Sequence, residues 1–279
     1  MTKSFSVAAG SEPIDAYYAL LSMLGGERIL ANVLNTLIER RKNKVLMFAL
    51  LDPDKFSPDK ARQLASRKEM GFFDAFLVGG STTIWQDRVD SIVRTLKENT
   101  DKPVIIFPSS ISNLSPYADA VLFLSLLNSS STFYVIDQQF QAAPIIRKMG
   151  LEAISTAYII MGDGGTAGYV GHARPIPYDK PELVEAYALA AEYLGFKLIY
   201  LEGGSGVRTP IRLEIIKRVK KITHVPLIVG GGIRDWKYIK SLEECGADGV
   251  VIGNLLENEN EFENFISQSP RERSEIKPF

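Results

Sequence analysis

The sequence predicts a (β/α)8 barrel, the α/β TIM-barrel fold in which eight parallel strands are each followed by a helix. Short apolar runs alternate with longer segments of helical spacing along most of the 279-residue chain. About eight such runs occur, which is the number that closes a parallel sheet into a barrel. Because 46% of the residues are hydrophobic, one large core can form. We therefore expect a single domain over residues 1–279, with the barrel core at about 45–268.

The expected elements follow from apolar periodicity and from proline and glycine at their ends. Helical spacing over residues 14–41 predicts lead-in helices that pack on or under the barrel. Strands are expected at 45–51, 75–78, 104–107, 120–124, 153–161, 198–201, 227–229 and 249–252. Helices are expected at 58–70, 83–98, 138–148, 181–194, 210–221, 235–245 and 258–267. Pro58 stands near the first turn of its helix, where proline is favoured, and Pro103 introduces the third strand.

Two connections depart from this regular alternation. Residues 108–119 are rich in serine, asparagine and proline and have no apolar stripe, which predicts a missing or irregular third helix. Residues 162–179 form a long loop with five glycines, and a loop of that length is usually functional or mobile. The tail after Pro270 is expected to be disordered.

Three late strands each lead into a glycine loop that is suited to phosphate. The loops are 202–206, 230–232 and 253–254. Glycine lets backbone N–H groups approach an anion closely, and the following helix adds unpaired N–H groups and the positive end of its dipole. Tight turns use glycine for structural reasons as well, but three adjacent loops favour a ligand site. We expect the chain to bind a phosphorylated small molecule at the carboxyl ends of its strands.

Few polar side chains stand at strand ends, where barrel enzymes place their chemistry. Asp52 and Ser81 follow the first two strands, and this sparse set of oxygens suits Mg²⁺, which completes its shell with water and substrate phosphates. Asp52 can also be read as part of a turn, because Pro53 follows it. Glu202 directly precedes Gly203 at the end of the sixth strand. A carboxylate there costs phosphate affinity, so we interpret Glu202 as a general base.

Composition and the remaining reactive side chains exclude several classes of protein. The net charge of -1 gives no long-range attraction to nucleic acid. The single cysteine, Cys245, excludes an internal disulfide, and His172 and His224 lack the partners of a catalytic triad or a zinc site. The first ten residues do not read as a signal peptide, and no stretch approaches the roughly 20 apolar residues of a membrane span. We expect a cytoplasmic protein without an integral membrane segment.

Taken in order, the strand-end motifs resemble those of the geranylgeranylglyceryl phosphate synthase family, which includes bacterial heptaprenylglyceryl phosphate synthases. The resemblance covers about residues 50–254, through motifs at 51–55, 78–81, 200–206, 230–233 and 252–254. Of these, only the run Tyr-Leu-Glu-Gly-Gly-Ser-Gly at 200–206 is specific by itself. That family also replaces the third helix by irregular chain. The resemblance implies transfer of a polyprenyl group, here geranylgeranyl, from its diphosphate to the C3 hydroxyl of sn-glycerol 1-phosphate, which forms an ether lipid precursor and releases diphosphate.

The same resemblance assigns roles by matching positions. It implies that Asp52 and Ser81 help to hold Mg²⁺ and that Glu202 takes or orients the hydroxyl proton. It implies that glycerol phosphate is bound by Tyr200, Leu201, Glu202, Gly203, Gly204, Ser205, Gly206, Gly231, Gly232, Gly253 and Asn254.

One position departs from the family pattern. Some bacterial members have a lysine that contacts glycerol phosphate where this chain has Leu50. Together with the pair Gly203-Gly204, this indicates the largely archaeal branch. It leaves open which cation, if any, replaces the lysine, with Lys55 and Arg234 as the two candidates. Members of that branch form dimers and hexamers, so the resemblance implies a homo-oligomer, with peripheral membrane contact through the lipid product.

Two other functions stay open on the sequence alone. Another phosphate-binding barrel, such as a sugar-phosphate isomerase or an indole-forming lyase, needs an acid/base pair at opposite strand ends, and Glu202 has no obvious partner. A non-catalytic barrel needs neither Asp52 nor Glu202, and the chain has both. For the prenyl chain, the expected lining is aromatic, although these residues suit a barrel core equally well: Phe107, Tyr117, Phe123 and Tyr158.

Overall fold

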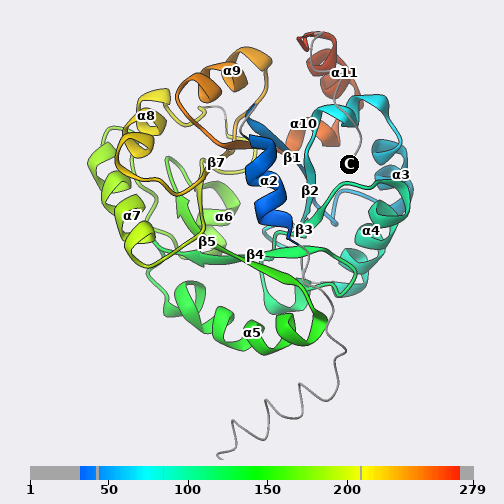
Figure 1. Cartoon of the computed structure of the whole chain (residues 1–279), viewed down its shortest axis with the longest axis horizontal. Coiled ribbons are helices and arrows are strands. Elements are labelled where there is room, and N and C mark those ends of the chain that lie inside the picture. Colours follow the sequence, from blue (N-terminus) through cyan, green and yellow to red (C-terminus); the bar gives the residue numbers. More distant parts are fainter. Residues whose placement is uncertain (1–31, 42–43, 84, 208, 271–279) are drawn as a thin grey trace, which may run out of the picture. The chain divides into compact units, whose positions relative to one another are not determined.

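The computed structural model describes residues 32–41, 44–83, 85–207 and 209–270. Within them, eight strands form a closed barrel in which each strand pairs with the next and the eighth pairs with the first. All eight pairings are parallel. Figure 1 shows the helices arranged around this ring of strands. The predicted (β/α)8 fold is confirmed.

The strands begin within one residue and end within two residues of the predicted positions. They are β1 (Leu46–Leu51), β2 (Ala75–Val78), β3 (Val104–Ile106), β4 (Ala120–Leu126), β5 (Glu152–Ile160), β6 (Leu198–Glu202), β7 (Leu227–Gly230) and β8 (Gly249–Ile252). The polar residues that were predicted at strand ends therefore lie together at one rim of the barrel, since parallel strands all point the same way.

The described helices follow the predicted alternation, with added short turns. They are α2 (Val33–Arg41), α3 (Pro58–Ala65), α4 (Gln86–Asn99), α5 (Gln138–Met149), α6 (Gly165–Val170), α7 (Pro181–Tyr193), α8 (Leu213–Ile222), α9 (Trp236–Glu244), α10 (Asn254–Glu257) and α11 (Glu259–Ser267). Three tighter or wider turns accompany them: the 3-10 turns η1 (Lys68–Phe72) and η2 (Ile111–Asn113), and the π-helical turn η3 (Phe133–Asp137). In these described ranges, no helix combines the length and the apolar character needed to cross a bilayer.

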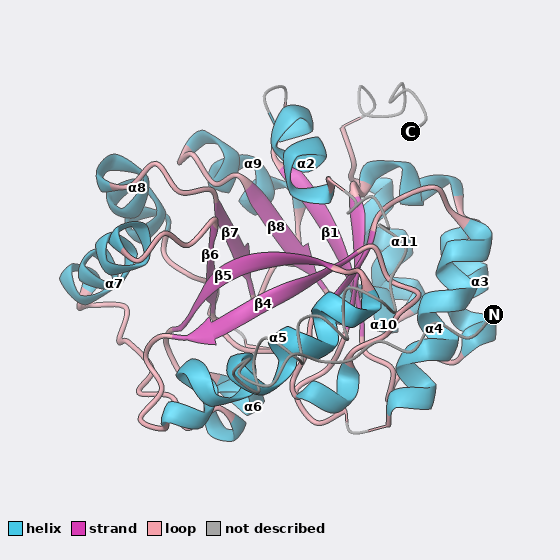
Figure 2. Ribbon diagram, turned by 60° about the horizontal axis from the view of Figure 1, so that its bottom comes forward, coloured by secondary structure: helices cyan, strands magenta, loops and turns pink. Residues whose placement is uncertain are grey.

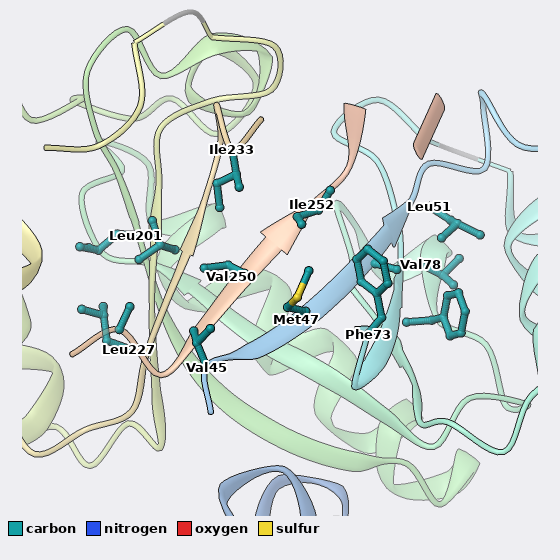
Figure 3. Packing of buried hydrophobic residues seen from close by; sticks show 14 of the residues in the cluster. Val45, Met47, Leu51, Phe73, Val78, Leu201, Leu227, Ile233, Val250 and Ile252 are labelled. Atoms are coloured by element: carbon teal, nitrogen blue, oxygen red, sulfur yellow. The ribbon is translucent and has the colours of Figure 1, made fainter. Parts of the chain in front are cut away.

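Alternation along each strand separates two apolar layers. Leu46 and Phe48 of β1 face the barrel interior, where they cluster with side chains of the other strands. Met47 and Leu51 face outward and pack with the surrounding helices. Figure 3 shows this outer layer, in which Met47 lies near Val250 of the neighbouring strand β8. Burial of both layers fixes the register of the strands and thus the heights of the residues at the rim.

Helix α2 closes the amino-terminal end of the barrel. Its buried residues Val33 and Leu37 join the interior cluster, and Figure 1 shows α2 lying across the strands. Glu152, at the start of β5, accepts hydrogen bonds from the first backbone N–H groups of the helix, and Arg41 in its last turn pairs with Asp248. The last part of the predicted lead-in is thus confirmed, whereas residues 14–31 of that prediction, like the tail after Pro270, lie outside the described residues.

The third crossover is irregular, as predicted. Between β3 and β4 only the three-residue turn η2 forms. Asn113 holds this segment in place of a helix: its amide donates to the carbonyl oxygen of Thr83 at 2.9 Å and its Oδ1 accepts from Ser109 Oγ at 2.6 Å and from the Ser110 N–H at 3.1 Å. The wall between β3 and β4 is therefore thin.

Three elements correct the sequence-based assignment. The expected loop at 162–179 contains helix α6, which begins at Gly165 with Gly164 as its N-cap. Both glycines have a positive φ (71° for Gly164 and 54° for Gly165), which glycine adopts without strain. Helix α10 starts at Asn254, with only Gly253 between it and β8, where a loop was expected. The π-helical turn η3 precedes α5. All three are short, and single turns leave too little periodicity to be recognised in a sequence.

Candidate active site

A cleft opens at the carboxyl ends of the strands and has a polar part and an apolar part. Most of the predicted site residues line the polar part: Asp52, Ser81, Tyr200, Glu202, Ser205, Gly206, Gly231, Gly232, Gly253 and Asn254. Gly203 and Gly204 lie behind this surface, in the turn that follows β6. The side chain of Leu201 faces the helices, so the structure does not bring it to the cleft.

Glu202 is the last residue of β6 and points into the barrel. Its side chain is buried, and its Oε1 accepts a hydrogen bond from the Gly204 N–H at 2.6 Å. The turn after β6 therefore fixes one carboxylate oxygen. Burial raises the pKa of the Glu202 carboxyl, although its hydrogen bonds with Gly204, Tyr200 and Tyr158 act in the opposite direction. A carboxyl with a raised pKa at the floor of a cleft is suited to proton transfer.

Two buried tyrosines lie one layer below Glu202. Tyr200 precedes Glu202 by two residues on β6 and stands opposite Tyr158 on β5, with 5.1 Å between the ring centroids. Phe107 stacks on Tyr200 at 5.4 Å. Burial, with the neighbouring carboxylate, raises the pKa of both tyrosines well above the usual value, so both hydroxyls stay protonated and serve as donors. Tyr158 was expected only as lining of the cleft, and its pairing with Tyr200 could be found only by aligning two strands.

The glycine loops meet closely beneath the polar part of the cleft. Asn254 Oδ1 accepts hydrogen bonds from the Gly206 N–H at 3.1 Å and from Ser205 Oγ at 3.3 Å. Gly231 has a φ of 88°, and a Cβ there would lie 2.8 Å from the Gly204 carbonyl oxygen. Only glycine fits at Gly231, since both the conformation and the close approach exclude a side chain. The loops after β6, β7 and β8 thus form one continuous backbone surface, as a phosphate site requires.

Asp52 follows the end of β1, the strand that pairs with β8 on one side and with β2 on the other. Its Oδ1 accepts from the Asp54 N–H at 3.0 Å and lies 3.3 Å from Thr83 Oγ1. A Cβ on Gly80 would collide with this carboxylate, so the chain after β2 passes directly beside it and carries Ser81 to the same cleft. One carboxylate and one hydroxyl fit a Mg²⁺ ion whose shell is completed by water and phosphate oxygens. In the described ranges, no group of three or more His, Cys, Asp or Glu side chains could hold a metal, so a preformed protein cage is not built here.

The two candidate cations differ in their surroundings. Lys55 forms an ion pair with Glu257, with 2.8 Å between Nζ and Oε1. Arg234 also lines the cleft, beside Gly231 and Gly232, and forms no ion pair with any described residue. His172 is exposed and stacks on Tyr134 with 5.8 Å between the rings, whereas His224 lies at the opposite end of the barrel.

The apolar part of the cleft extends from the barrel centre toward α5. Its lining comes from β4, from α5 and from the residue that follows η2: Leu114, Leu122, Phe123, Leu124, Leu126, Ala142 and Ile146. Of the aromatic residues expected there, Phe107, Phe123 and Tyr158 line the cleft, but Tyr117 does not. The Tyr117 ring lies instead beneath the guanidinium of Arg94, at 3.7 Å, on the outer surface. The thin wall at η2 leaves the space in which this apolar part lies.

The fold and the cleft together define a TIM barrel whose cleft joins a glycine-rich polar part to an apolar part, called the apolar arm below. The chain belongs to the PcrB family, whose family model matches residues 37–269. It is 44% identical over 238 residues to geranylgeranylglyceryl phosphate synthase of Pyrococcus horikoshii, which covers 85% of this chain and 94% of that protein. It is 48% identical over 218 residues to the Saccharolobus solfataricus protein of the same name, which covers 78% and 85%.

Solved structures agree with the sequence relatives. A crystal structure of (S)-3-O-geranylgeranylglyceryl phosphate synthase from Thermoplasma acidophilum, in complex with the substrate sn-glycerol-1-phosphate, superposes with a TM-score of 0.81 at 38% identity and covers 88% of this chain and 99% of its own. The Thermoplasma volcanium protein gives 0.80 at 39% identity and covers 85% and 95%. The predicted family is confirmed.

Proposed function

We propose that the chain joins a polyprenyl group from its diphosphate to the C3 hydroxyl of sn-glycerol 1-phosphate, which forms an ether lipid precursor and releases diphosphate. The observation that carries this proposal is the position of Glu202. Its buried carboxyl lies between the glycine loops, which suit a small phosphate, and an apolar arm, which suits a hydrocarbon chain. An isomerase or lyase that acts on one small sugar phosphate binds no hydrocarbon chain, so its reaction does not account for the apolar arm.

In this proposal, different residues of the chain bind glycerol phosphate, orient it and accept its proton. The loops held by Asn254 and Gly231 bind the phosphate of glycerol phosphate and direct its C3 hydroxyl toward Glu202. The hydroxyl oxygen forms a bond to C1 of the prenyl group, the C1–oxygen bond to diphosphate breaks, and the hydroxyl proton passes to Glu202. Tyr158 and Tyr200 hold the carboxyl from below, so it keeps one orientation throughout.

Asp52 and Ser81 are the residues that would hold Mg²⁺. When bound there, Mg²⁺ would supply positive charge that neutralises the diphosphate, so that it would be a better leaving group and positive charge on the allylic carbon would be favoured. Because that carbon is already electrophilic, Glu202 does not need to be a strong base. Apolar side chains around the arm exclude water, which otherwise competes with the hydroxyl.

The finer parts of the proposal follow from family membership. We infer that geranylgeranyl is the prenyl group, that Mg²⁺ is required, that the protein works in the cytoplasm, and that it assembles as a homo-oligomer, either a dimer or a hexamer. Related proteins that carry the same name and span most of this chain support the geranylgeranyl group.

Incubation of the purified protein with radiolabelled sn-glycerol 1-phosphate and a series of prenyl diphosphates tests the reaction. We expect label to enter the organic phase only with Mg²⁺ present, and most rapidly with the 20-carbon diphosphate. The enantiomer sn-glycerol 3-phosphate is the matched control substrate, since it offers the same groups in the wrong arrangement. Absence of organic-phase label with every diphosphate tested excludes the prenyl transfer.

A further inference from the structure

An exposed apolar stripe runs along η3 and α5. Phe133, Ile136 and Phe140 are 43%, 57% and 77% exposed. Single exposed apolar residues are common on proteins, but three neighbours on one helical surface mark an interaction site. The spacing of Ile136 and Phe140, four residues apart, places both on one face.

The stripe adjoins the apolar arm of the cleft. Gln139, Ala142 and Ile146 line the arm from the same helix that carries Phe140 outside. Figure 2 shows α5 on the outside of the barrel, next to β4, whose residues form the opposite wall of the arm. A hydrocarbon chain in the arm is therefore separated from the stripe by the thickness of one helix.

Charge on α5 distinguishes a lipid surface from other partners. The helix ends with Arg147 and Lys148, both exposed, and contains no acidic residue. The one carboxylate of η3, on Asp137, accepts a hydrogen bond from Thr132 Oγ1 at 3.0 Å. Arg147 lies seven residues beyond Phe140 and continues the same face. Apolar side chains followed by basic ones on one helix face are typical of segments that lie in the surface of an anionic bilayer.

We propose that this stripe docks the protein on the surface of an anionic lipid bilayer. The inference rests on the proposed function, because the prenyl diphosphate and the ether product both carry a long hydrocarbon chain that partitions into bilayers. Docking through α5 brings the arm next to the lipid that holds the substrate, so the chain passes between bilayer and cleft with little exposure to water.

Vesicle flotation of the full chain, without substrates, tests the docking. We expect the protein to float with vesicles of anionic phospholipid and to do so less with zwitterionic vesicles or at high salt. Ile136→Ser with Phe140→Ser should lower the bound fraction at least tenfold. The matched control replaces Tyr193 and Leu194, which are 82% and 71% exposed at the end of α7, by serine and should float like the parent.

The flotation results test membrane docking, and the transfer assay tests the proposed reaction, so the two can fail independently. If the parent chain does not float, the stripe is covered by a second copy or by another part of the chain, and the proposal fails. A stripe variant that floats like the parent overturns docking through the stripe. A stripe variant whose molar mass by light scattering falls, while the control's does not, assigns the stripe to assembly instead. Prenyl transfer is measured for all three proteins with detergent-dispersed diphosphate. If the parent floats but transfers nothing, the proposed reaction is wrong while the docking stands.

Discussion

Asn254 and Gly206 join two of the three glycine loops through a hydrogen bond of 3.1 Å from the Gly206 N–H to Asn254 Oδ1. The same oxygen accepts from Ser205 Oγ. One side chain after β8 thus sets the conformation of the turn after β6, so the phosphate surface depends on a contact between residues that are far apart in sequence.

Asn254→Ala removes this acceptor, and we expect the KM for glycerol phosphate to rise by about 10- to 100-fold, because one or two hydrogen bonds to the loop are lost. The KM for the prenyl diphosphate should stay near that of the parent. Steady-state kinetics with each substrate varied in turn gives both values. Equal increases in the two constants contradict a local role for Asn254.

Asp52→Ala should abolish most prenyl transfer by weakening Mg²⁺ and diphosphate binding. The melting temperature should change little, since Asp52 lies at the rim. Asp54→Ala is the matched control, because Asp54 also contacts Thr83 but pairs with Arg88 outside the cleft. Activity measured over a Mg²⁺ titration decides: near-normal rates for the Asp52 variant at limiting Mg²⁺ rule out its role in holding the metal.

Glu202→Gln keeps the shape of the side chain but removes its ability to accept a proton. We expect kcat to fall by about 100-fold or more, while glycerol phosphate binds as well as before or more tightly, because a negative charge beside the phosphate is gone. Calorimetric binding and single-turnover rates separate the two effects. A variant that fails only through weak binding contradicts the proton-accepting role.

Tyr158→Phe should move the pH dependence of turnover. Its hydrogen bond lowers the pKa of the Glu202 carboxyl, so loss of the hydroxyl raises that pKa further. The rate requires the carboxylate and therefore falls as pH drops through the pKa, and this acid limb should shift to higher pH in the variant. Tyr117→Phe, outside the cleft, is the control and should leave the profile of kcat/KM against pH unchanged. Identical profiles for parent and Tyr158 variant argue against the contact.

Tyr169 is 89% exposed on α6 and is our candidate for an assembly contact, since exposed aromatic side chains often anchor subunit interfaces. Tyr169→Ala should lower the molar mass from that of a hexamer toward that of a dimer and leave transfer largely intact. Light scattering, together with the transfer assay, checks both. An unchanged mass with sharply reduced activity assigns Tyr169 to a lid over the cleft.

The sequence was sufficient to predict the strands and the residues at the rim of the barrel. A parallel strand buried on both faces is a short continuous apolar run, and its end is therefore visible in the sequence. Asp52 and Glu202 could be placed in this way, each directly after an apolar run. The outward direction of the Leu201 side chain follows from the same alternation. It was missed because the whole motif at 200–206 was assigned to the site without considering the direction of each side chain. Tyr117 could not be placed, because its partner Arg94 lies on a neighbouring helix and only the tertiary structure brings the two together. The short helices α6 and α10 depend on glycine conformations and neighbouring loops, which no local pattern records.

The short turn η2, in place of a crossover helix, lies beside a cleft whose two parts have separate linings. The loops after β6, β7 and β8 line the polar part, which we propose receives glycerol phosphate. Residues of β4 and α5, with Leu114 after η2, line the apolar arm, which we propose receives the prenyl chain. We therefore expect substitutions that widen or shorten the apolar arm to leave the polar part unchanged. A barrel of this design can change the lipid tail it accepts while it keeps the same stereochemistry at glycerol.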